Sequence, residues 1–164
     1  MSVITENRYL SVVEAKQTIA RHQTAAPVQL IPLAKEFGLE VYRVPNWPND
    51  LSGMIRKDSE AGGPSGFAIY VNASHAPVRR RFTIAHEIAH FVLHRDKIGD
   101  GIVDDALYRS GLSSRQEAEA NRLAADILMP WHLINDAMRN GYNTIDGLAK
   151  LFDVSRSAMS IRLG

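Results

Sequence analysis

The amino-acid sequence predicts an α+β fold in which helices surround a small sheet of about three strands. Two observations support this prediction. Apolar residues recur with helical spacing along most of the chain, and strand-like stretches are confined to the region between residues 39 and 72. The chain has 164 residues, of which 45% are hydrophobic and 23% charged, as expected for one globular domain with at most a small appendage.

The first part of the chain predicts two helices followed by the strands. Apolar residues form one stripe of a helix over residues 11–21. Pro27 and Pro32 bracket a short second helix, which ends at Gly38. Three stretches are then predicted as strands, with turn-forming residues between them: 39–44, 52–57 and 66–72.

The second part of the chain predicts mainly helices. Pro77 suits the first turn of a helix that runs through His94. Residues 95–112 contain three glycines and several charges, which predicts an exposed loop. The remaining helices are each ended by a proline, a glycine or a short polar turn: 114–129, 131–140, 144–152 and 155–163.

Composition narrows the classes of protein to which the chain can belong. Cysteine is absent, so any metal ion must be held by histidines and carboxylates. The net charge of +1 gives no global basic field of the kind typical of nucleic-acid-binding proteins. No apolar run approaches the roughly 18 residues of a membrane span, and the first ten residues lack the apolar core of a signal peptide. These features predict a cytoplasmic protein.

The most informative local pattern is His86-Glu87-Ile88-Ala89-His90, which has the form H-E-x-x-H. Residues four apart on a helix lie on one face with Cβ atoms about 5–6 Å apart, so both imidazoles can bind one metal ion at about 2.0–2.1 Å. Glu87 lies about 100° round the helix, where its carboxylate can act as the general base of a zinc hydrolase. The alternative is a helix with two ordinary histidines, and the presence of Glu87 and of apolar flanks disfavours it.

A catalytic zinc ion usually takes three protein ligands, and a downstream histidine does not supply the third here. Asp96 stands six residues after His90, where many zinc peptidases have that histidine. His94 repeats the four-residue spacing but lies about 12 Å along the helix from the first histidine of the motif. We expect His94 to contact substrate or to be a partly exposed histidine at the helix end. It is also one of three candidates, with Tyr108 and His75, for the donor that stabilises the oxyanion.

The third ligand is expected instead on the helix over residues 114–129. Glu117 and Glu119 point to nearly opposite sides of this helix, so only one of them can serve. Asn121 follows Glu117 by one turn and could hydrogen-bond a ligand. The alternative role for Glu117 is the last residue of a capping box, S-x-x-E, that begins at Ser114.

Several longer segments together resemble the ImmA/IrrE family of metallopeptidases. They are RRRFTIAHEIAHFVLH (79–94), EAEANRLAADILMP (117–130), GMIRKD with GFAIYVNAS (53–58 and 66–74), LAKLFDVSRSAMSIRL (148–163) and PVQLIPLAKEFGLEVYRV (27–44). These segments follow the family's order over nearly the whole chain, which is far more specific than H-E-x-x-H alone. One departure is Leu123, where the family commonly has phenylalanine, and we expect it to affect packing only.

The resemblance implies both a fold and a site. The fold is zincin-like, with a peptidase domain over residues 1–140 and a helix-turn-helix-like pair of helices over residues 141–164 packed on the same domain. Glu87 is implied as the catalytic base, and the implied ligands of a Zn²⁺ ion are His86, His90 and Glu117.

The resemblance also implies a role. It is that of a zinc-dependent metallopeptidase that cleaves or controls a helix-turn-helix repressor of the XRE type, as in damage responses, mobile elements or toxin–antitoxin pairs. The alternative is a non-catalytic regulator that binds such a repressor or antitoxin without cutting it. In both cases the expected partner is a protein, and neither nucleic acid nor a membrane is expected to be bound directly.

Two further features leave alternatives open. Residues 66–72 form either a core strand or the sheet edge along which a substrate peptide pairs. Residues 145–163 have helix-turn-helix spacing, and Arg156 and Arg162 could meet phosphates. However, Asp153 stands where glycine is frequent in such turns, and basic residues are few. The pattern favours packing on the core or contact with a protein over DNA binding.

Overall fold

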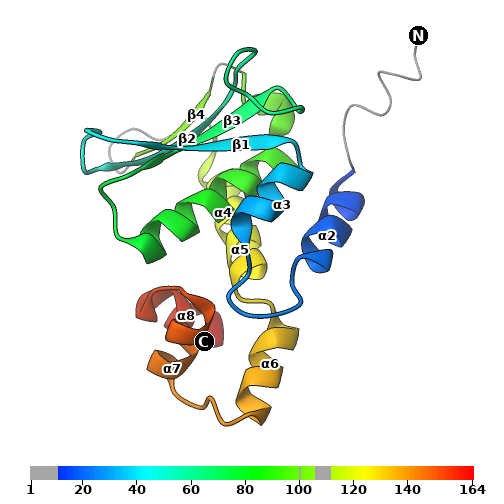
Figure 1. The fold of residues 1–164 in the computed structure, drawn as a ribbon, viewed down its shortest axis with the longest axis vertical. Coiled ribbons are helices and arrows are strands. Elements are labelled where there is room, and N and C mark those ends of the chain that lie inside the picture. Colours follow the sequence, from blue (N-terminus) through cyan, green and yellow to red (C-terminus); the bar gives the residue numbers. More distant parts are fainter. Residues whose placement is uncertain (1–10, 100, 106–111) are drawn as a thin grey trace.

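The structure, a computed structural model, describes residues 11–99, 101–105 and 112–164, with the side chains of 102–105 outside the description. It confirms the predicted α+β class (Figure 1). The helices are α2 (Val12–Arg21), α3 (Leu30–Glu36), α4 (Pro77–Leu93), the 3-10 helix η1 (Arg95–Lys97), α5 (Ser114–Leu128), α6 (Trp131–Arg139), α7 (Ile145–Phe152) and α8 (Arg156–Leu163). The strands are β1 (Leu39–Val44), β2 (Leu51–Lys57), β3 (Phe67–Asn72) and β4 (Ile102–Asp105). Among the described helices, none combines the length and the apolar character that a membrane crossing needs.

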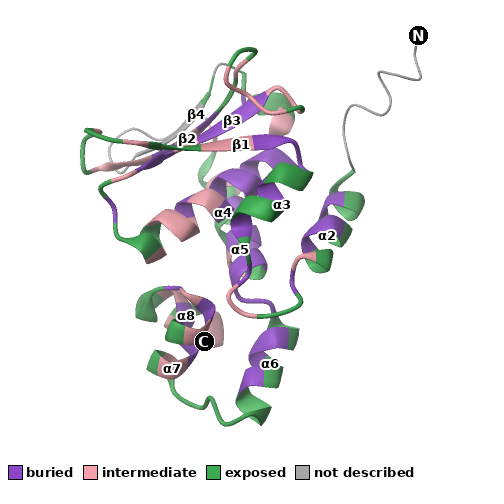
Figure 2. Cartoon of the chain, in the orientation of Figure 1, coloured by how far each residue is buried: buried purple, intermediate pink, exposed green. Residues whose placement is uncertain are grey.

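The sheet has the strand order β1-β3-β2-β4. The three predicted strands are present, and β3 lies between β1, with which it is parallel, and β2, with which it is antiparallel. The predicted use of residues 66–72 as an edge for a substrate peptide is therefore wrong, because β3 is paired on both sides. Its residues are almost all buried (Figure 2).

The fourth strand comes from the segment that the sequence predicts as an exposed loop, so this prediction is wrong for β4 and η1. β4 pairs antiparallel with β2, with an irregularity between Leu51 and Gly53. Four residues are too few for an alternating pattern to be recognised, and Gly99 and Gly101 precede them. The strand forms because it pairs with the edge of β2, which is distant in the sequence.

The helices cover one face of the sheet. α3 packs against β1, α4 packs against β3 and β2, and α5 packs along α4, so that α4 is the central helix beneath the sheet (Figure 1). One buried hydrophobic cluster includes side chains of every described α-helix and of β1 to β3. Pro32 lies in the first turn of α3 rather than before it, a position where a missing N–H costs no intrahelical hydrogen bond.

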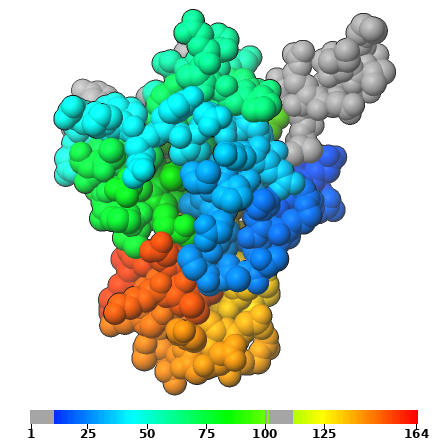
Figure 3. Space-filling model, in the orientation of Figure 1, coloured from blue at the N-terminus to red at the C-terminus, as the bar shows by residue number. Residues whose placement is uncertain are grey.

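The C-terminal helix pair packs directly against the rest of the molecule (Figure 3). Phe152 and Met159 are fully buried in the common core. Arg81 of α4 donates hydrogen bonds to the carbonyl oxygens of Asp153 and Val28 at 3.0 and 3.1 Å. Asp153 has the left-handed conformation (φ 57°) that glycine usually supplies in such a turn.

Candidate metal centre

The H-E-x-x-H residues lie in the second half of α4, where the helix is most deeply buried. Pro77 occupies its first turn, and the helix ends at His94, whose N–H donates to His90. Ile88 and Phe91 pack into the core, while His86 and His90 face α5. The helix therefore presents both imidazoles to a neighbouring helix and not to bulk solvent.

Glu117 on α5 meets both histidines. The Nε2 atom of His86 lies 3.2 Å from Glu117 Oε1, and the Nε2 atom of His90 lies 3.4 Å from Glu117 Oε2. The two imidazole rings stand nearly perpendicular, with 4.5 Å between their centroids. One ligand atom from each of these three residues lies within 4.8 Å of the other two.

These three side chains could hold a metal ion. Tetrahedral ligands at about 2.1 Å from a zinc ion are about 3.4 Å apart, which agrees with the two distances between histidine nitrogens and carboxylate oxygens. Two imidazoles and one carboxylate are a usual ligand set of catalytic zinc. The donor set thus fits the metal that the sequence predicts, with no thiolate required.

The capping role considered for Glu117 is wrong, because the capping box lies one residue earlier than the predicted one. The cap is Ser113, whose hydroxyl accepts from Gln116 N while the Gln116 side chain accepts from Ser113 N. Because Gln116 completes the capping box, the Glu117 side chain is available to face α4. The other candidate ligand, Glu119, instead lies 3.3 Å from His94 Nε2.

His94 is not the partly exposed helix-end residue that was one of the two expectations, since its relative exposure is 4%. Its Nδ1 lies 3.0 Å from His90 Nδ1. If His90 uses Nε2 for a metal, its Nδ1–H donates to His94, whose Nε2–H then donates to Glu119. Burial lowers the pKa of His94, which favours the neutral ring that this chain of hydrogen bonds needs. The sequence signal for this role was the repeated four-residue spacing.

Glu87 is fully buried beneath β2. A Cβ atom built on Gly53 of β2 would lie 3.1 Å from Glu87 Oε2 and 2.4 Å from Thr83 Cγ2. Strand β2 can approach the helix this closely only because residue 53 has no side chain. Glycine at this position is therefore part of what positions Glu87, a role that sequence reasoning missed.

The remaining candidates have other surroundings. Asn121 is exposed and lines a groove, and no hydrogen bond from it to the metal centre is found among the described residues. His75 is held before α4 by Asn49 and Asn72, whose atoms lie 2.7 and 3.3 Å from its Nε2. Tyr108 lies outside the described residues.

The two arginines considered for DNA contact are engaged within the protein. Arg162 Nη1 lies 2.9 Å from Asp126, and Arg162 Nε donates to Met129 O at 2.9 Å. Arg156 Nε donates to Asp146 at 2.7 Å. The Arg162 contacts join α8 to α5 and its C-cap, whereas the Arg156 contact is an exposed ion pair within the C-terminal helix pair.

Two histidines one turn apart with a glutamate between them, and a second glutamate from the next helix, are typical of zinc-dependent peptidases. Comparison with known families also leads to a peptidase. The chain belongs to the Peptidase M78 family, whose model, described as the IrrE N-terminal-like domain, matches residues 34–164. The predicted resemblance is therefore confirmed.

Individual relatives match only in part. The radiation response metalloprotease IrrE of Deinococcus radiodurans is 35% identical over 88 residues, which are 54% of this chain and 27% of that protein. A solved structure described as a Mycobacterium tuberculosis transcriptional regulator has a TM-score of 0.62 at 21% identity, and covers 97% of this chain and 48% of that one. At this identity the structural match shows the fold alone. The chain thus spans about a quarter to a half of these proteins.

Proposed function

We propose that the chain is a zinc-dependent metallo-endopeptidase in which His86, His90 and Glu117 hold the zinc ion. The observation that carries this proposal is the convergence of the three side chains, with ligand atoms within 4.8 Å of one another. Membership of a peptidase family and the likeness to a metalloprotease support it.

The residues around the centre have separable tasks in peptide hydrolysis. When bound, the zinc ion supplies a Lewis acid for the peptide carbonyl and for the attacking water. Glu87 takes a proton from that water and returns it to the amine nitrogen as the C–N bond breaks. His94, buried against His90 and Glu119, holds the His90 ring in the orientation that directs Nε2 towards Glu117.

We further propose that the substrate is a transcriptional repressor of the helix-turn-helix, XRE type, as in a toxin–antitoxin or mobile-element pair. The similarity to a radiation response metalloprotease supports a regulatory role. The alternative, a regulator that binds its partner uncut, differs in one measurable outcome: zinc-loaded protein and repressor would form a stable complex with both chains intact.

The test uses purified protein that is stripped with chelator and reloaded with zinc. Incubated with a small helix-turn-helix repressor encoded beside it, the wild type should cut the repressor, and the Glu87→Gln variant should bind one zinc ion but lose cleavage by at least about 100-fold. Glu60→Gln, the same change at an exposed site, is the control. Undiminished cleavage by Glu87→Gln would refute the mechanism.

A further inference from the structure

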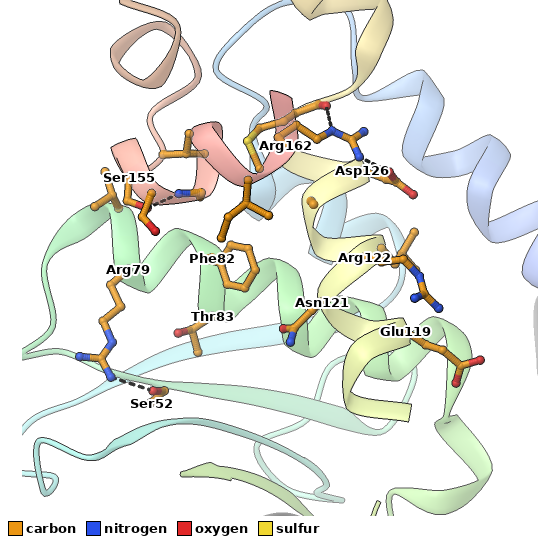
Figure 4. A pocket seen from close by; sticks show the side chains of 18 of the residues that line it. Ser52, Arg79, Phe82, Thr83, Glu119, Asn121, Arg122, Asp126, Ser155 and Arg162 are labelled. Atoms are coloured by element: carbon orange, nitrogen blue, oxygen red, sulfur yellow. Dashed lines mark hydrogen bonds and ion pairs between the residues drawn. The ribbon is translucent and has the colours of Figure 1, made fainter. Parts of the chain in front are cut away.

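A groove of about 1060 Å³ lies between α4, α5 and α8 (Figure 4). Its lining includes Ser52 of β2, Arg79 and Thr83 of α4, Asn121 of α5 and Ile161 of α8. Pockets for small molecules are roughly 300–1,000 Å³. The groove is therefore large enough for several residues of a peptide.

The lining of the groove reaches to within one helical turn of the candidate metal ligands on both α4 and α5. Thr83 lies about one turn before His86 on α4, and Asn121 lies one turn after Glu117 on α5. Both therefore share helix faces with candidate ligands, and Figure 4 shows them on the two helices that flank the groove. A peptide bound in the groove would therefore lie one helical turn from the candidate ligands, a place that suits the residues flanking a scissile bond.

Apolar side chains line the middle of the groove. Phe82 of α4 and Ala158 of α8 are half-buried, and Met129 at the end of α5 is buried. Ile161 is 78% exposed on α8. These groups offer apolar surface that a peptide side chain could cover, at about 25 cal/mol per Å² of surface removed from water.

The charges along the groove are mainly positive. Four cationic side chains and two carboxylates line the groove and give it a net charge of +2: Lys16, Arg79, Arg122, Arg162, Glu119 and Asp126. Arg162 and Asp126 pair with each other. Arg79 donates to the neutral hydroxyl of Ser52, and no ion pair of Arg122 is found in the part of the chain that the structure describes. Both arginines can therefore meet an anionic partner.

We propose that this groove binds the substrate segment beside the scissile bond and selects apolar side chains flanked by acidic ones. This inference rests on the proposed peptidase function. The apolar middle of the groove favours a peptide over a nucleic-acid backbone, whose phosphates would use the cations alone. The groove thereby assigns a substrate-selecting role to the C-terminal helix α8, which carries no candidate metal ligand.

The test measures peptide binding by fluorescence anisotropy with the zinc-loaded, full-length Glu87→Gln protein, so that the probe is not cut. The probes are a fluorescein-labelled peptide with a leucine core flanked by glutamates and its counterpart flanked by lysines. The glutamate peptide should bind roughly tenfold more tightly. Arg122→Glu should remove this preference, whereas the control Arg115→Glu, the same charge reversal on an exposed part of α5 outside the groove, should not.

A second variant tests the apolar part of the groove. Ala158→Trp should weaken the binding of both peptides by roughly tenfold, because the indole fills part of the groove. The melting temperature of this variant shows whether it is folded. Equal binding of the two peptides, equal effects of the two charge reversals, or binding of a DNA duplex in place of the peptides would overturn the inference. If the glutamate peptide binds with the expected preference but the zinc-loaded wild type cuts no repressor, the proposed peptidase function is refuted, and the groove is a peptide-binding site without a scissile bond.

Discussion

Replacing Gly53 by alanine tests whether the close approach of β2 to α4 positions Glu87, the proposed general base. The new Cβ atom would lie 2.4 Å from Thr83 Cγ2 and 3.1 Å from both Glu87 Oε2 and Tyr70 O. Ordinary contacts between such atoms begin near 3.4 Å, so strand and helix must separate by about 1 Å at the Thr83 contact. Neither the buried helix nor the paired strand can yield that distance without cost.

Overpacking of this kind costs typically about 1–3 kcal/mol. For a chain of this size, a loss of about 2 kcal/mol lowers the melting temperature by roughly 4–8 °C. Because Glu87 Oε2 must also move, we expect the activity of Gly53→Ala to fall by more than the loss of folded protein explains. Urea unfolding measures the first effect, and cleavage at a temperature where both proteins are fully folded measures the second.

A second substitution identifies the cause. Thr83→Ser removes the methyl group that the new Cβ would meet, at a cost of about 1 kcal/mol by itself. In this background Gly53→Ala should be less destabilising by at least about 1 kcal/mol. The same loss in both backgrounds, or a fully stable and active Gly53→Ala protein, would refute the reasoning.

Three further predictions concern the ligand set, the core and the acid limb of stability. Loss of a residue that only hydrogen-bonds to a metal ligand typically weakens metal binding by roughly 10–100-fold. Glu117→Gln should weaken zinc binding by more than this, and Glu119→Gln should weaken it by less than Glu117→Gln does, as measured by competition with a zinc chelator. Arg81→Met should lower the free energy of unfolding, measured by urea unfolding, by about 2–3 kcal/mol, because two partly buried carbonyl oxygens lose their donor. A loss below about 0.5 kcal/mol would contradict this. Hydrogen bonds from Ala61 N–H, then Arg56 and Tyr70, hold the pKa of Asp58 well below its usual value. Since the folded pKa is the lower one, this stabilisation is present above about pH 4 and is lost on further acidification. Melting curves of Asp58→Asn should therefore depend less on pH below about pH 4 than those of the wild type.

The spacing of the candidate ligands could be predicted because it depends on helix periodicity, whereas the choice of Glu117 over Glu119 rested on the family resemblance. His86 and His90 are four residues apart and share one face of α4. Glu117 and Glu119 lie on opposite sides of α5, so only one of them can face the two histidines. The α+β class followed from the same kind of local pattern. The zinc ligands themselves stay a prediction until a metal is measured.

Other features could not be predicted, either because two local patterns fitted equally well or because they depend on contacts between distant segments. The capping box begins at Ser113 and not at Ser114, and two adjacent serines with Gln116 and Glu117 after them fit both frames equally well. β4 exists because β2 has an edge to pair with. His94 is buried because α5 and Glu119 cover the end of α4, which no pattern within α4 could reveal.

The guanidinium of Arg81 has a consequence for how the chain can be divided. It joins the helix that carries both histidines to the turn between α7 and α8, while Phe152 and Met159 complete the same core. A protein that ends at the predicted boundary near residue 140 would keep every candidate ligand. It would, however, expose apolar core surface and leave the Arg81 guanidinium without its acceptor on Asp153. We therefore expect the shortened chain to lose its fold and, with it, the arrangement of the candidate ligands.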